Sequence, residues 1–283
     1  MNDEPHALLK IADRLRSFDG RVVVVKLGGS AMEVPVATRG MVDAVAALQT
    51  LGVKMALVHG GGKPIDRAMD AAGLQRVKIQ GRRYTDDATL EIVVKVLHEI
   101  NESLVGRFAD RGAKVAGVRN GVFGTRLVLR TIDHQPVDLG HVGNVTAIDR
   151  ELFLKYLQND SVPVVPSLAL DENGGWLNVN ADSMAAGLAR EVGAESVLFL
   201  TDTPGVQRDR HDPDSRLARL TVEECRNLID SGAIEGGMIP KVEACFEALG
   251  AGAARAVILD GRNIHSLLDD FLEPGSTGTQ IVK

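Results

Sequence analysis

Short apolar runs alternate along this chain with longer stretches in which apolar residues recur every three or four positions. Runs that end in glycine or polar residues predict buried strands, and the periodic stretches predict amphipathic helices. The predicted strands are residues 22–26, 55–58, 115–118, 162–165, 196–200 and 256–259. The predicted helices are residues 3–18, 41–51, 65–72, 90–111, 178–192 and one helix within 228–250. Strands that alternate with helices predict an α/β fold, a three-layer αβα sandwich around a mostly parallel, open sheet.

Residues 121–149 depart from this alternation. Leu127 and Leu129 alternate there with turn residues, which predicts a β-hairpin beside the sheet. The extra N-terminal helix precedes the first strand, so it either packs on its own domain or contacts another subunit. No internal repeat or linker is visible in the sequence. We therefore expect one domain over residues 1–283, with an N-terminal lobe, 1–192, and a C-terminal lobe, 193–283.

Charge and composition narrow the range of functions. The chain has 283 residues, a formal net charge of -6 and only 4% aromatic residues. This balance disfavours nucleic acid or an acidic membrane as a partner. The two cysteines, Cys225 and Cys245, have the spacing of neither a disulfide framework nor a metal site. Because the sequence has no signal-like N-terminus and no membrane-spanning apolar run, we expect a cytoplasmic protein.

Two of the predicted strands end in glycine-rich turns. Lys26 stands just before the glycines at 28–29, and a second strand runs into three glycines at 60–62. Glycines between a strand and a helix present backbone N–H groups and a helix N-terminus to an anion. Two such turns on neighbouring parallel strands can hold a phosphoryl group from two sides. The sequence therefore predicts an enzyme that moves phosphate.

The common signatures of other sites are absent. Gly62-Lys63 is not a P-loop, because position 57 is leucine rather than glycine and Pro64 follows the lysine. Residues 250–255 lack the last glycine of a dinucleotide fingerprint. Neither a zinc-binding helix nor a nucleophile elbow occurs.

Three further segments carry polar groups at the ends of predicted elements. Residues 178–182 offer two asparagines and an aspartate where a helix cap needs one such residue. Residues 202–205 follow a strand at its C-terminal end, where ligands bind in open α/β sheets. Lys241 begins a helix, a position that the helix dipole disfavours for a cation unless an anion lies nearby.

In this order, the segments resemble the amino-acid kinase family, and within it the enzymes that phosphorylate N-acetyl-L-glutamate. The matching motifs are Lys26-Leu-Gly-Gly-Ser-Ala-Met32, His59-Gly-Gly-Gly62, Gly81-Arg-Arg-Tyr-Thr85, Asn178-Val-Asn-Ala-Asp182, Leu200-Thr-Asp-Thr-Pro-Gly205, Gly236-Gly-Met-Ile-Pro-Lys241 and Asp260-Gly-Arg-Asn-Ile-His265. The resemblance implies the carbamate-kinase-like fold. It also implies ATP-dependent phosphorylation of the side-chain carboxylate of N-acetyl-L-glutamate, the second step of arginine biosynthesis. The product is an acyl phosphate, N-acetyl-L-glutamyl 5-phosphate.

The resemblance also assigns roles to residues. Lys26 and Lys241 would stabilise the transferring phosphoryl group, and Asp182 would orient both ammonium groups. Phosphate-binding N–H groups would come from Gly28, Gly29 and Gly60. Acetylglutamate would contact Gly61, Gly62, Arg83, Asn178 and Asn180, with Arg83 on its α-carboxylate. The nucleotide would contact Thr201, Asp202, Gly205, Val206, Gln207, Ala233, Ile234, Glu235 and Met238. ATP would bring Mg²⁺, held by phosphates and water without a metal site of the protein.

The N-terminal helix and the tail 260–283 resemble the arginine-inhibited branch of the family. In that branch the helix interlaces dimers into a hexamer, and L-arginine binds beside it. The resemblance places Asp270, Gly275 and Gly278 at the arginine site. We expect a homo-oligomer, a dimer or a hexamer built as a trimer of dimers. Whether a nitrogen-signalling protein binds cannot be inferred from the sequence.

Alternatives and departures accompany this interpretation. A kinase of the same fold that acts on carrier-linked aminoadipate or glutamate is one alternative, although the segment 178–182 favours free acetylglutamate. A non-catalytic arginine sensor is another, although both lysines and Asp182 are present. A carbamate- or aspartate-type kinase would not be expected to have the motif at 81–85. Lys63 is an insertion relative to the family pattern, and Arg119 to Phe123 replace a segment that usually carries serine and aspartate.

Overall fold

The central sheet follows from six apolar runs, because strands buried on both faces read as nearly continuous hydrophobic segments. The computed structural model describes residues 7–130, 135–209 and 212–283. Within them, the main sheet has the strand order β14-β16-β15-β13-β1-β2-β10-β5. Neighbouring strands are parallel except at the β15–β16 pair. The predicted α/β sandwich around a mostly parallel, open sheet is confirmed.

Most predicted elements are present within a few residues of their predicted bounds. The helices are α1 (Ala7–Arg16), α2 (Gly29–Glu33), α3 (Pro35–Thr50), α4 (Gly62–Ala71), α5 (Asp87–Ala109), α6 (Arg150–Gln158), α7 (Ala181–Val192), α8 (Val222–Asp230), α9 (Ile239–Gly250) and α10 (Ser266–Leu272), with 3₁₀ turns η1 (Pro213–Ser215) and η2 (Gly236–Met238). The strands of the main sheet are β1 (Val22–Leu27), β2 (Lys54–His59), β5 (Val115–Gly117), β10 (Val162–Pro166), β13 (Ala194–Thr201), β14 (Arg219–Thr221), β15 (Arg255–Asp260) and β16 (Thr279–Val282).

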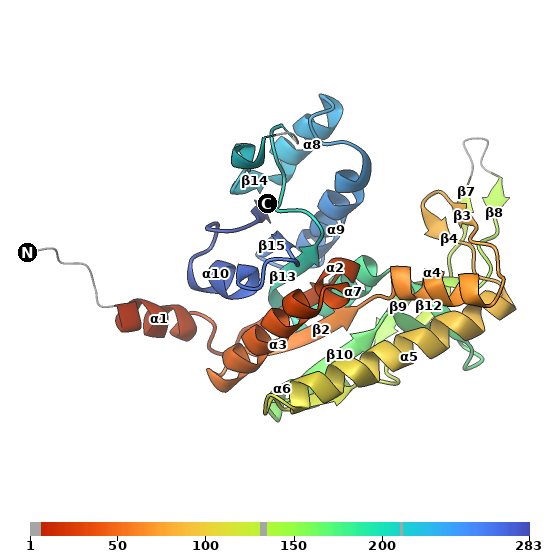
Figure 1. The fold of residues 1–283 in the computed structure, drawn as a ribbon, viewed down its shortest axis with the longest axis horizontal. Helices are drawn as coiled ribbons and strands as arrows, with labels where there is room; N and C mark the ends of the chain where they lie inside the picture. The colour runs from red at the N-terminus through yellow and green to blue at the C-terminus, as the bar shows by residue number, and fades with distance from the viewer. Residues whose placement is uncertain (1–6, 131–134, 210–211) are drawn as a thin grey trace, which may run out of the picture.

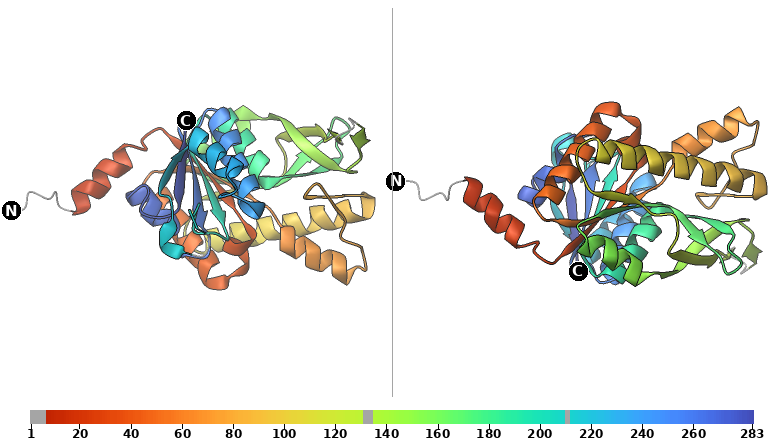
Figure 2. Two further views of the ribbon diagram at one scale, coloured as in Figure 1. Left: turned by 90° about the horizontal axis from the view of Figure 1, so that it is seen from above. Right: turned by 90° about the horizontal axis from the view of Figure 1, so that it is seen from below.

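Helices cover both faces of this sheet. Alternate side chains of β1 point to opposite layers: Val22 and Val24 pack with α7 and α9, whereas Val23 and Val25 pack with α3 and α10. Figure 2 shows the sheet between these layers, with α1 extending to one side and α5 to the other. Every helix among the described residues is too short or too polar to cross a lipid bilayer.

The predicted hairpin in residues 121–149 is confirmed, but its strands belong to a small barrel and not to the main sheet. β6 (Val122–Arg126) pairs antiparallel with β9 (Val142–Ile148). These two strands close a small barrel with β11 (Leu168–Leu170) and β12 (Trp176–Val179). Two short strand pairs lie apart from it: β3 (Lys78–Ile79) with β4 (Arg82–Arg83), and β7 (Leu129–Arg130) with β8 (Pro136–Val137).

Two boundaries were predicted wrongly. The helix expected from residue 178 begins at Ala181, because Asn178 lies on β12 and pairs with β11 and β9. The strand series was expected to end at residue 259, but β16 pairs antiparallel with β15 and lies between it and β14. The helices α2, α6, α8 and α10 were also not predicted.

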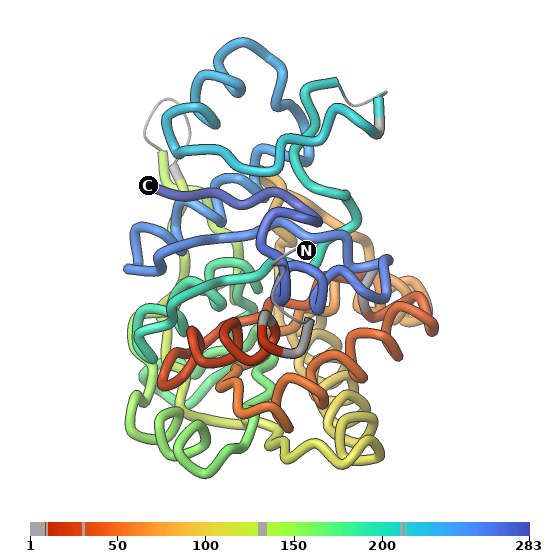
Figure 3. Tube along the Cα trace, turned by 90° about the vertical axis from the view of Figure 1, so that its left-hand side faces the viewer, coloured from red at the N-terminus to blue at the C-terminus, as the bar shows by residue number. Residues whose placement is uncertain are grey.

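The two ends of the chain occupy different parts of the molecule. Figures 1 and 3 show the segments after β13 (cyan to blue) at one end and most earlier segments (red to green) at the other. One sheet joins these two parts of the molecule, because β1 pairs in parallel with β13. The division into lobes at residue 193 stays a prediction. Helix α1 projects from the body, and Arg14 on it donates from Nε to the carbonyl oxygen of Phe271 at 2.7 Å.

Candidate active site

A cavity of about 430 Å³ opens where β1, β2 and β13 end. These are the carboxyl ends of parallel strands, where turns and helix N-termini converge. Its lining brings together most of the residues that the sequence singled out. They are Lys26, Gly28, Gly29, Gly60, Gly61, Gly62, Lys63, Arg83, Asn178, Asn180, Asp182, Thr201, Asp202 and Lys241.

Lys26 enters the cavity from the penultimate position of β1. Its Nζ lies 2.9 Å from Oδ1 of Asp182, in the first turn of α7. The two side chains are 14% and 27% exposed, so solvent screens this pair less than a surface pair. A carboxylate in the first turn is also stabilised by the helix dipole. The ammonium group of Lys26 is therefore held at a fixed place on the cavity wall.

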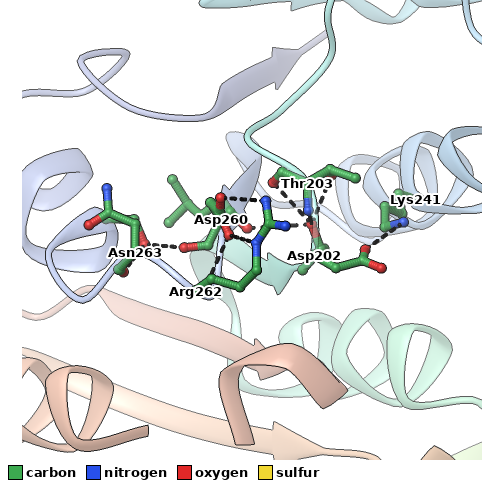
Figure 4. Close-up of polar contacts among 9 residues, drawn as sticks. Asp202, Thr203, Lys241, Asp260, Arg262 and Asn263 are labelled. Atoms are coloured by element: carbon green, nitrogen blue, oxygen red, sulfur yellow. Dashed lines mark hydrogen bonds and ion pairs between the residues drawn. The ribbon is translucent and has the colours of Figure 1, made fainter. Parts of the chain in front are cut away.

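Lys241 reaches the same cavity from the other end of the molecule. It lies in the first turn of α9, and its Nζ is 3.1 Å from Oδ1 of Asp202, which follows β13 (Figure 4). Burial opposes ionisation of Asp202, but the hydrogen bond and charge of Lys241 outweigh it, so the Asp202 pKa lies below its ordinary value. Asp182 thus pairs with Lys26, and the carboxylate beside Lys241 is Asp202. That Asp182 orients both lysines stays a prediction.

Figure 4 shows a second ion pair behind Asp202. Arg262 donates from Nε and Nη2 to the two carboxylate oxygens of Asp260, at 2.9 and 2.8 Å. The charge of Arg262 also contributes to the lowered pKa of Asp202. Positive and negative groups thus alternate from Lys241 to Asp260 along the ends of β13 and β15.

The glycine turns bring backbone close to the cavity. The Gly28 N–H donates to the Leu200 carbonyl oxygen at 2.8 Å, and a Cβ at Gly28 would collide with that oxygen. Helix α4 begins at Gly62, and no side chain caps its N-terminus at Gly61. The first N–H groups of a helix have no intrahelical acceptor. The second turn therefore offers donors suited to an anion. In the first turn the Gly28 N–H, predicted to bind phosphate, is already bonded to Leu200.

Arg83 and the asparagines line the side of the cavity near the barrel. Arg83 is 11% exposed and donates from Nη2 to Oδ1 of Asp66 at 2.5 Å. Asn178 donates from Nδ2 to the hydroxyl of Thr85 at 3.1 Å. Asn180 caps α7, because its Oδ1 accepts from two backbone N–H groups of the first turn. The cap occupies that oxygen and leaves the Asn180 amide NH₂ for a ligand.

Several predicted nucleotide residues lie outside the lining of this cavity. They are Gly205, Val206, Gln207, Ala233, Ile234, Glu235 and Met238. The Val206 N–H donates to Oγ1 of Thr279 at 2.8 Å, which fixes the loop after β13 against β16. Residues 233–238 directly precede α9, the helix that carries Lys241. These residues flank the Lys241 side of the cavity.

Of the predicted arginine-site residues, Asp270 and Gly278 are buried and Gly275 is partly exposed. Asp270 is fully buried on α10 and pairs with Arg255, 3.0 Å from Nη1 to Oδ2. Burial raises the Asp270 pKa against the attraction of Arg255. The carbonyl oxygens of Gly275 and Gly278 accept from the Arg216 guanidinium. A ligand would reach the Asp270 carboxylate only if the pair with Arg255 opened.

Sequence reasoning missed several partners of the site. Asp66 holds Arg83, and Glu33 accepts from Lys63 and Arg67, at 2.9 and 2.7 Å. These partners come from α2 and α4, and ordinary acidic residues on short helices gave no signal. His59 was read only as part of a motif, yet it is fully buried beside the second glycine turn. Arg119, in the segment 119–123 that departs from the family pattern, makes an exposed ion pair with Glu102.

Comparison with known sequences agrees with the resemblance. The profile described as "Amino acid kinase family" matches residues 21–260. An acetylglutamate kinase of Brachyspira hyodysenteriae is 36% identical over 270 residues, which cover 95% of this chain and 93% of the relative. An acetylglutamate kinase of Methanosphaera stadtmanae is 36% identical over 289 residues, covering 99% and 97%. One of Synechocystis is 37% identical over 269 residues, covering 95% and 90%.

Solved structures share the fold at lower identity. An N-acetylglutamate synthase of Neisseria gonorrhoeae, complexed with coenzyme A and N-acetyl-glutamate, has a TM-score of 0.85 and 22% identity. The match covers 98% of this chain and 63% of the synthase, so the chain spans less than two thirds of that protein. A Giardia carbamate kinase has a TM-score of 0.67 and 16% identity, covering 93% and 99%.

Proposed function

The chain belongs to the amino acid kinase family, and we propose that it transfers the γ-phosphoryl group of ATP to the side-chain carboxylate of N-acetyl-L-glutamate. The observation that carries the phosphoryl-transfer chemistry is the convergence of Lys26 and Lys241 on one cavity between two glycine turns. The acceptor is supported by relatives named acetylglutamate kinase that match this chain over nearly their whole length. The product, N-acetyl-L-glutamyl 5-phosphate, belongs to arginine biosynthesis.

This reaction needs charge stabilisation more than proton transfer. The attacking carboxylate is already ionised at neutral pH, so no general base is required. The difficulty is the approach of that anion to a polyanionic phosphate. Lys26 and Lys241 offer positive charge from two sides, and Gly29 and the turn at 60–62 offer backbone N–H groups. Preorganised donors of this kind are the largest single source of catalysis in such sites.

The carboxylates of the site hold the lysines in place. Asp182 holds Lys26, and Asp202 holds Lys241, each within 3.1 Å. Among the described residues, no group of three His, Cys, Asp or Glu side chains is arranged to hold a metal ion. Mg²⁺ binds readily to nucleotide phosphates while keeping several waters. We propose that Mg²⁺ would be held by the phosphates of ATP and by water, and would neutralise part of the phosphate charge.

Acetylglutamate occupies the barrel side of the cavity in this proposal. Arg83 binds its α-carboxylate, because a guanidinium offers a pair of parallel donors to a carboxylate. The amide of Asn178 binds the acetamido group, and Thr85 keeps that amide oriented. The nucleotide occupies the opposite side, from Thr201 and Asp202 toward the segments at 205–207 and 233–238.

A hydroxamate-trapping assay tests the proposal directly. The enzyme is incubated with ATP, Mg²⁺, hydroxylamine and one acceptor at a time: N-acetyl-L-glutamate, L-glutamate, L-aspartate, L-2-aminoadipate or carbamate. Hydroxylamine converts an acyl phosphate to a hydroxamate, so the coloured product identifies the acceptor. We expect N-acetyl-L-glutamate to give the highest kcat/KM. Greater turnover of another acceptor would contradict the assignment, and so would an absence of turnover with all five free acceptors, as the carrier-protein alternative predicts.

We further propose that the enzyme is cytoplasmic, assembles as a homo-oligomer and is inhibited by L-arginine. Support comes from the resemblance of α1 and the tail to the arginine-inhibited branch. The connection between them is physical, because Arg14 of α1 lies over the rings of Phe18 and Phe271, at 4.5 and 5.9 Å. A dimer, or a hexamer of interlaced dimers, is the expected assembly.

A further inference from the structure

His59 is the last residue of β2 and lies directly under the second glycine turn. Its side chain is fully buried, unlike those of the lysines that line the cavity. Its Nδ1 is 3.2 Å from the carbonyl oxygen of Gly60, and its Nε2 is 3.1 Å from Nδ2 of Asn101. Asn101 comes from α5, which packs beside α4 (Figure 1). The imidazole thus connects α5 to the backbone of the turn.

The hydrogen bonds determine which ring nitrogen carries the proton. A carbonyl oxygen can only accept, so Nδ1 must donate to Gly60. The Asn101 Nδ2 has two protons: one goes to the Val164 carbonyl oxygen at 2.9 Å, and the other to Nε2 of His59. The ring is therefore neutral, with its proton on Nδ1. Burial agrees with this, because it lowers the His59 pKa to about 4.

The bond to Gly60 fixes the direction of a peptide group. In a trans peptide, the C=O of one residue and the N–H of the next point in opposite directions. The Gly60 carbonyl is turned toward the buried imidazole, so the Gly61 N–H is turned away from it, toward the cavity that Gly60, Gly61 and Gly62 line. A glycine-rich turn has little of its own to hold this orientation, since glycine populates a wide range of backbone angles.

We propose that His59, held by Asn101, is a positioning residue that keeps the Gly60–Gly61 peptide oriented so that the Gly61 N–H meets the reacting anions. This inference rests on the proposed phosphoryl transfer, and it adds a buried support to the donors of the cavity. Both Gly61 and Asn101 are closely packed. A Cβ at Gly61 would press on Leu97 at 2.9 Å, and a Cβ at Gly117 would press on Oδ1 of Asn101 at 2.6 Å.

Two amide variants separate the two hydrogen bonds of the ring. In His59→Asn, the side-chain NH₂ replaces Nδ1 and can still donate to Gly60. In His59→Gln, the amide reaches the Nε2 position and can bond Asn101, but no donor faces Gly60. The matched control is His98→Asn, one turn earlier on α5, where the ring lies edge-on to Trp176 and has no bond to the turn.

The measurements are kcat, both KM values and the melting temperature of each variant. Loss of a preformed oxyanion donor costs about 10²-fold in kcat, so a donor that is free to reorient should cost about tenfold or more. We expect that loss in His59→Gln, recovery to within about threefold in His59→Asn, and no change in His98→Asn. Equal losses in both His59 variants, or a kcat that simply follows the melting temperature, would overturn the proposal.

A spectroscopic arm keeps this test independent of the proposed acceptor. Long-range ¹H–¹⁵N correlation on histidine-labelled wild-type protein should show His59 neutral and protonated on Nδ1, unchanged from about pH 5.5 to pH 8. Protonation on Nε2 would overturn the proposal. If the acceptor panel selects another substrate, the variants are compared with that substrate, so an error in the proposed function does not hide an error here.

Discussion

Each lysine of the cavity has its own carboxylate, and this pairing bears on what the lysines can do. Lys26 with Asp182 and Lys241 with Asp202 keep two ammonium groups in fixed positions on opposite sides. Long flexible side chains lose conformational entropy when they are ordered. The carboxylates impose that order in the folded protein, so less ordering is left for the moment of reaction.

Removal of either lysine should therefore impair chemistry more than folding. We expect Lys26→Ala and Lys241→Ala to lower kcat by about 10²-fold or more, as for the loss of a charge-stabilising donor. The steady-state hydroxamate assay measures this. Lys155→Ala, an exposed lysine on α6, is the control and should match the wild type. Near-normal turnover in either cavity variant would mean that this lysine does not stabilise the transferring phosphoryl group.

Arg83 should act on the acceptor rather than on the nucleotide. Its guanidinium donates both to Asp66 and to the Gly62 carbonyl oxygen, and a lysine cannot reproduce this fork. We expect Arg83→Lys to raise the KM for N-acetyl-L-glutamate about tenfold, with the KM for ATP unchanged. Initial rates over both substrate concentrations decide this. A change in the KM for ATP alone would mean that Arg83 contacts the nucleotide rather than the acceptor.

His59 should also make stability depend on pH. Its pKa is 6.5 in the unfolded chain and about 4 in the folded protein, because burial disfavours the charged ring. Between these values the unfolded chain binds a proton that the folded protein does not. The unfolding free energy should therefore fall as pH decreases from 6.5 to about 4, by about 3 kcal/mol from this group. Urea unfolding across this range, with His59→Asn and His98→Asn as comparisons, measures the contribution. An identical pH dependence in His59→Asn would contradict it.

At the residue scale, the sequence predicted which groups gather but not how they pair. The lysines and glycines stand at strand and helix ends, and such ends meet at one edge of a parallel sheet. The partner of Lys241 was not predictable in the same way. Asp182 and Asp202 both lie at that edge, and only the positions of α7 and α9 place Asp202 beside Lys241. Asn101 gave no signal at all, since an asparagine within a long helix usually faces solvent.

At the scale of elements, one side chain ties together the helices that follow the two glycine turns. Glu33 ends α2, is 18% exposed, and accepts from Lys63 and Arg67 of α4. The hydrogen bond from Lys63 is the main reason why the Glu33 pKa lies below its ordinary value. Lys63, which departs from the family pattern, thus helps to connect α2 to α4 through Glu33.

Loss of the tie should affect catalysis modestly and in a salt-dependent way. Lys63 and Arg67 are 71% and 66% exposed, so the interaction is worth at most about 1 kcal/mol. We expect Glu33→Gln to lower kcat/KM by up to about fivefold at low salt. The difference from wild type should vanish near 1 M salt, where the Debye length is about 3 Å. A salt-independent loss would mean that Glu33 acts in another way.

The wrongly predicted elements share a physical cause. The sequence assigns residues 178–180 to the following helix, because asparagine and small residues fit a helix start. The strand conformation of β12 comes from pairing with β9 and β11, which lie far away in the sequence. Likewise, β16 is short, and only its place between β14 and β15 makes it a strand. Local patterns cannot contain such long-range pairing.

At the scale of the whole molecule, the sheet brings together two distant parts of the chain. Lys26 lies on β1 and Lys241 on α9, and the parallel pairing of β1 with β13 brings their elements to one edge. The alternation of strands and helices was enough to predict this architecture. The position of α1 was not predictable in that way, because an amphipathic helix outside the sheet can pack on any apolar surface.

The place of α1 makes it a candidate link between subunits and the C-terminal segment. Arg14 of this helix donates to the Phe271 carbonyl oxygen, and the Phe18 ring, just after the helix, stacks on Phe271 at 4.2 Å. Deletion of residues 1–16 removes the helix and leaves Phe18 in place. We expect the deletion to abolish inhibition by millimolar L-arginine and to reduce a hexamer to dimers. The kcat without arginine should stay within about twofold, since none of the described residues 7–16 lines the cavity.

Two measurements and one point variant make this last prediction sharp. Light scattering after size exclusion gives the mass of the assembly, and the hydroxamate assay with added arginine gives the inhibition. Arg14→Ala removes the contact with Phe271 while keeping the helix, so it separates the coupling of α1 to α10 from assembly. We expect this variant to keep the assembly of the wild type and to need more arginine for half inhibition. Full-length enzyme that millimolar arginine leaves fully active would refute the regulation itself. Inhibition that persists unchanged in the deletion would show that arginine acts without α1.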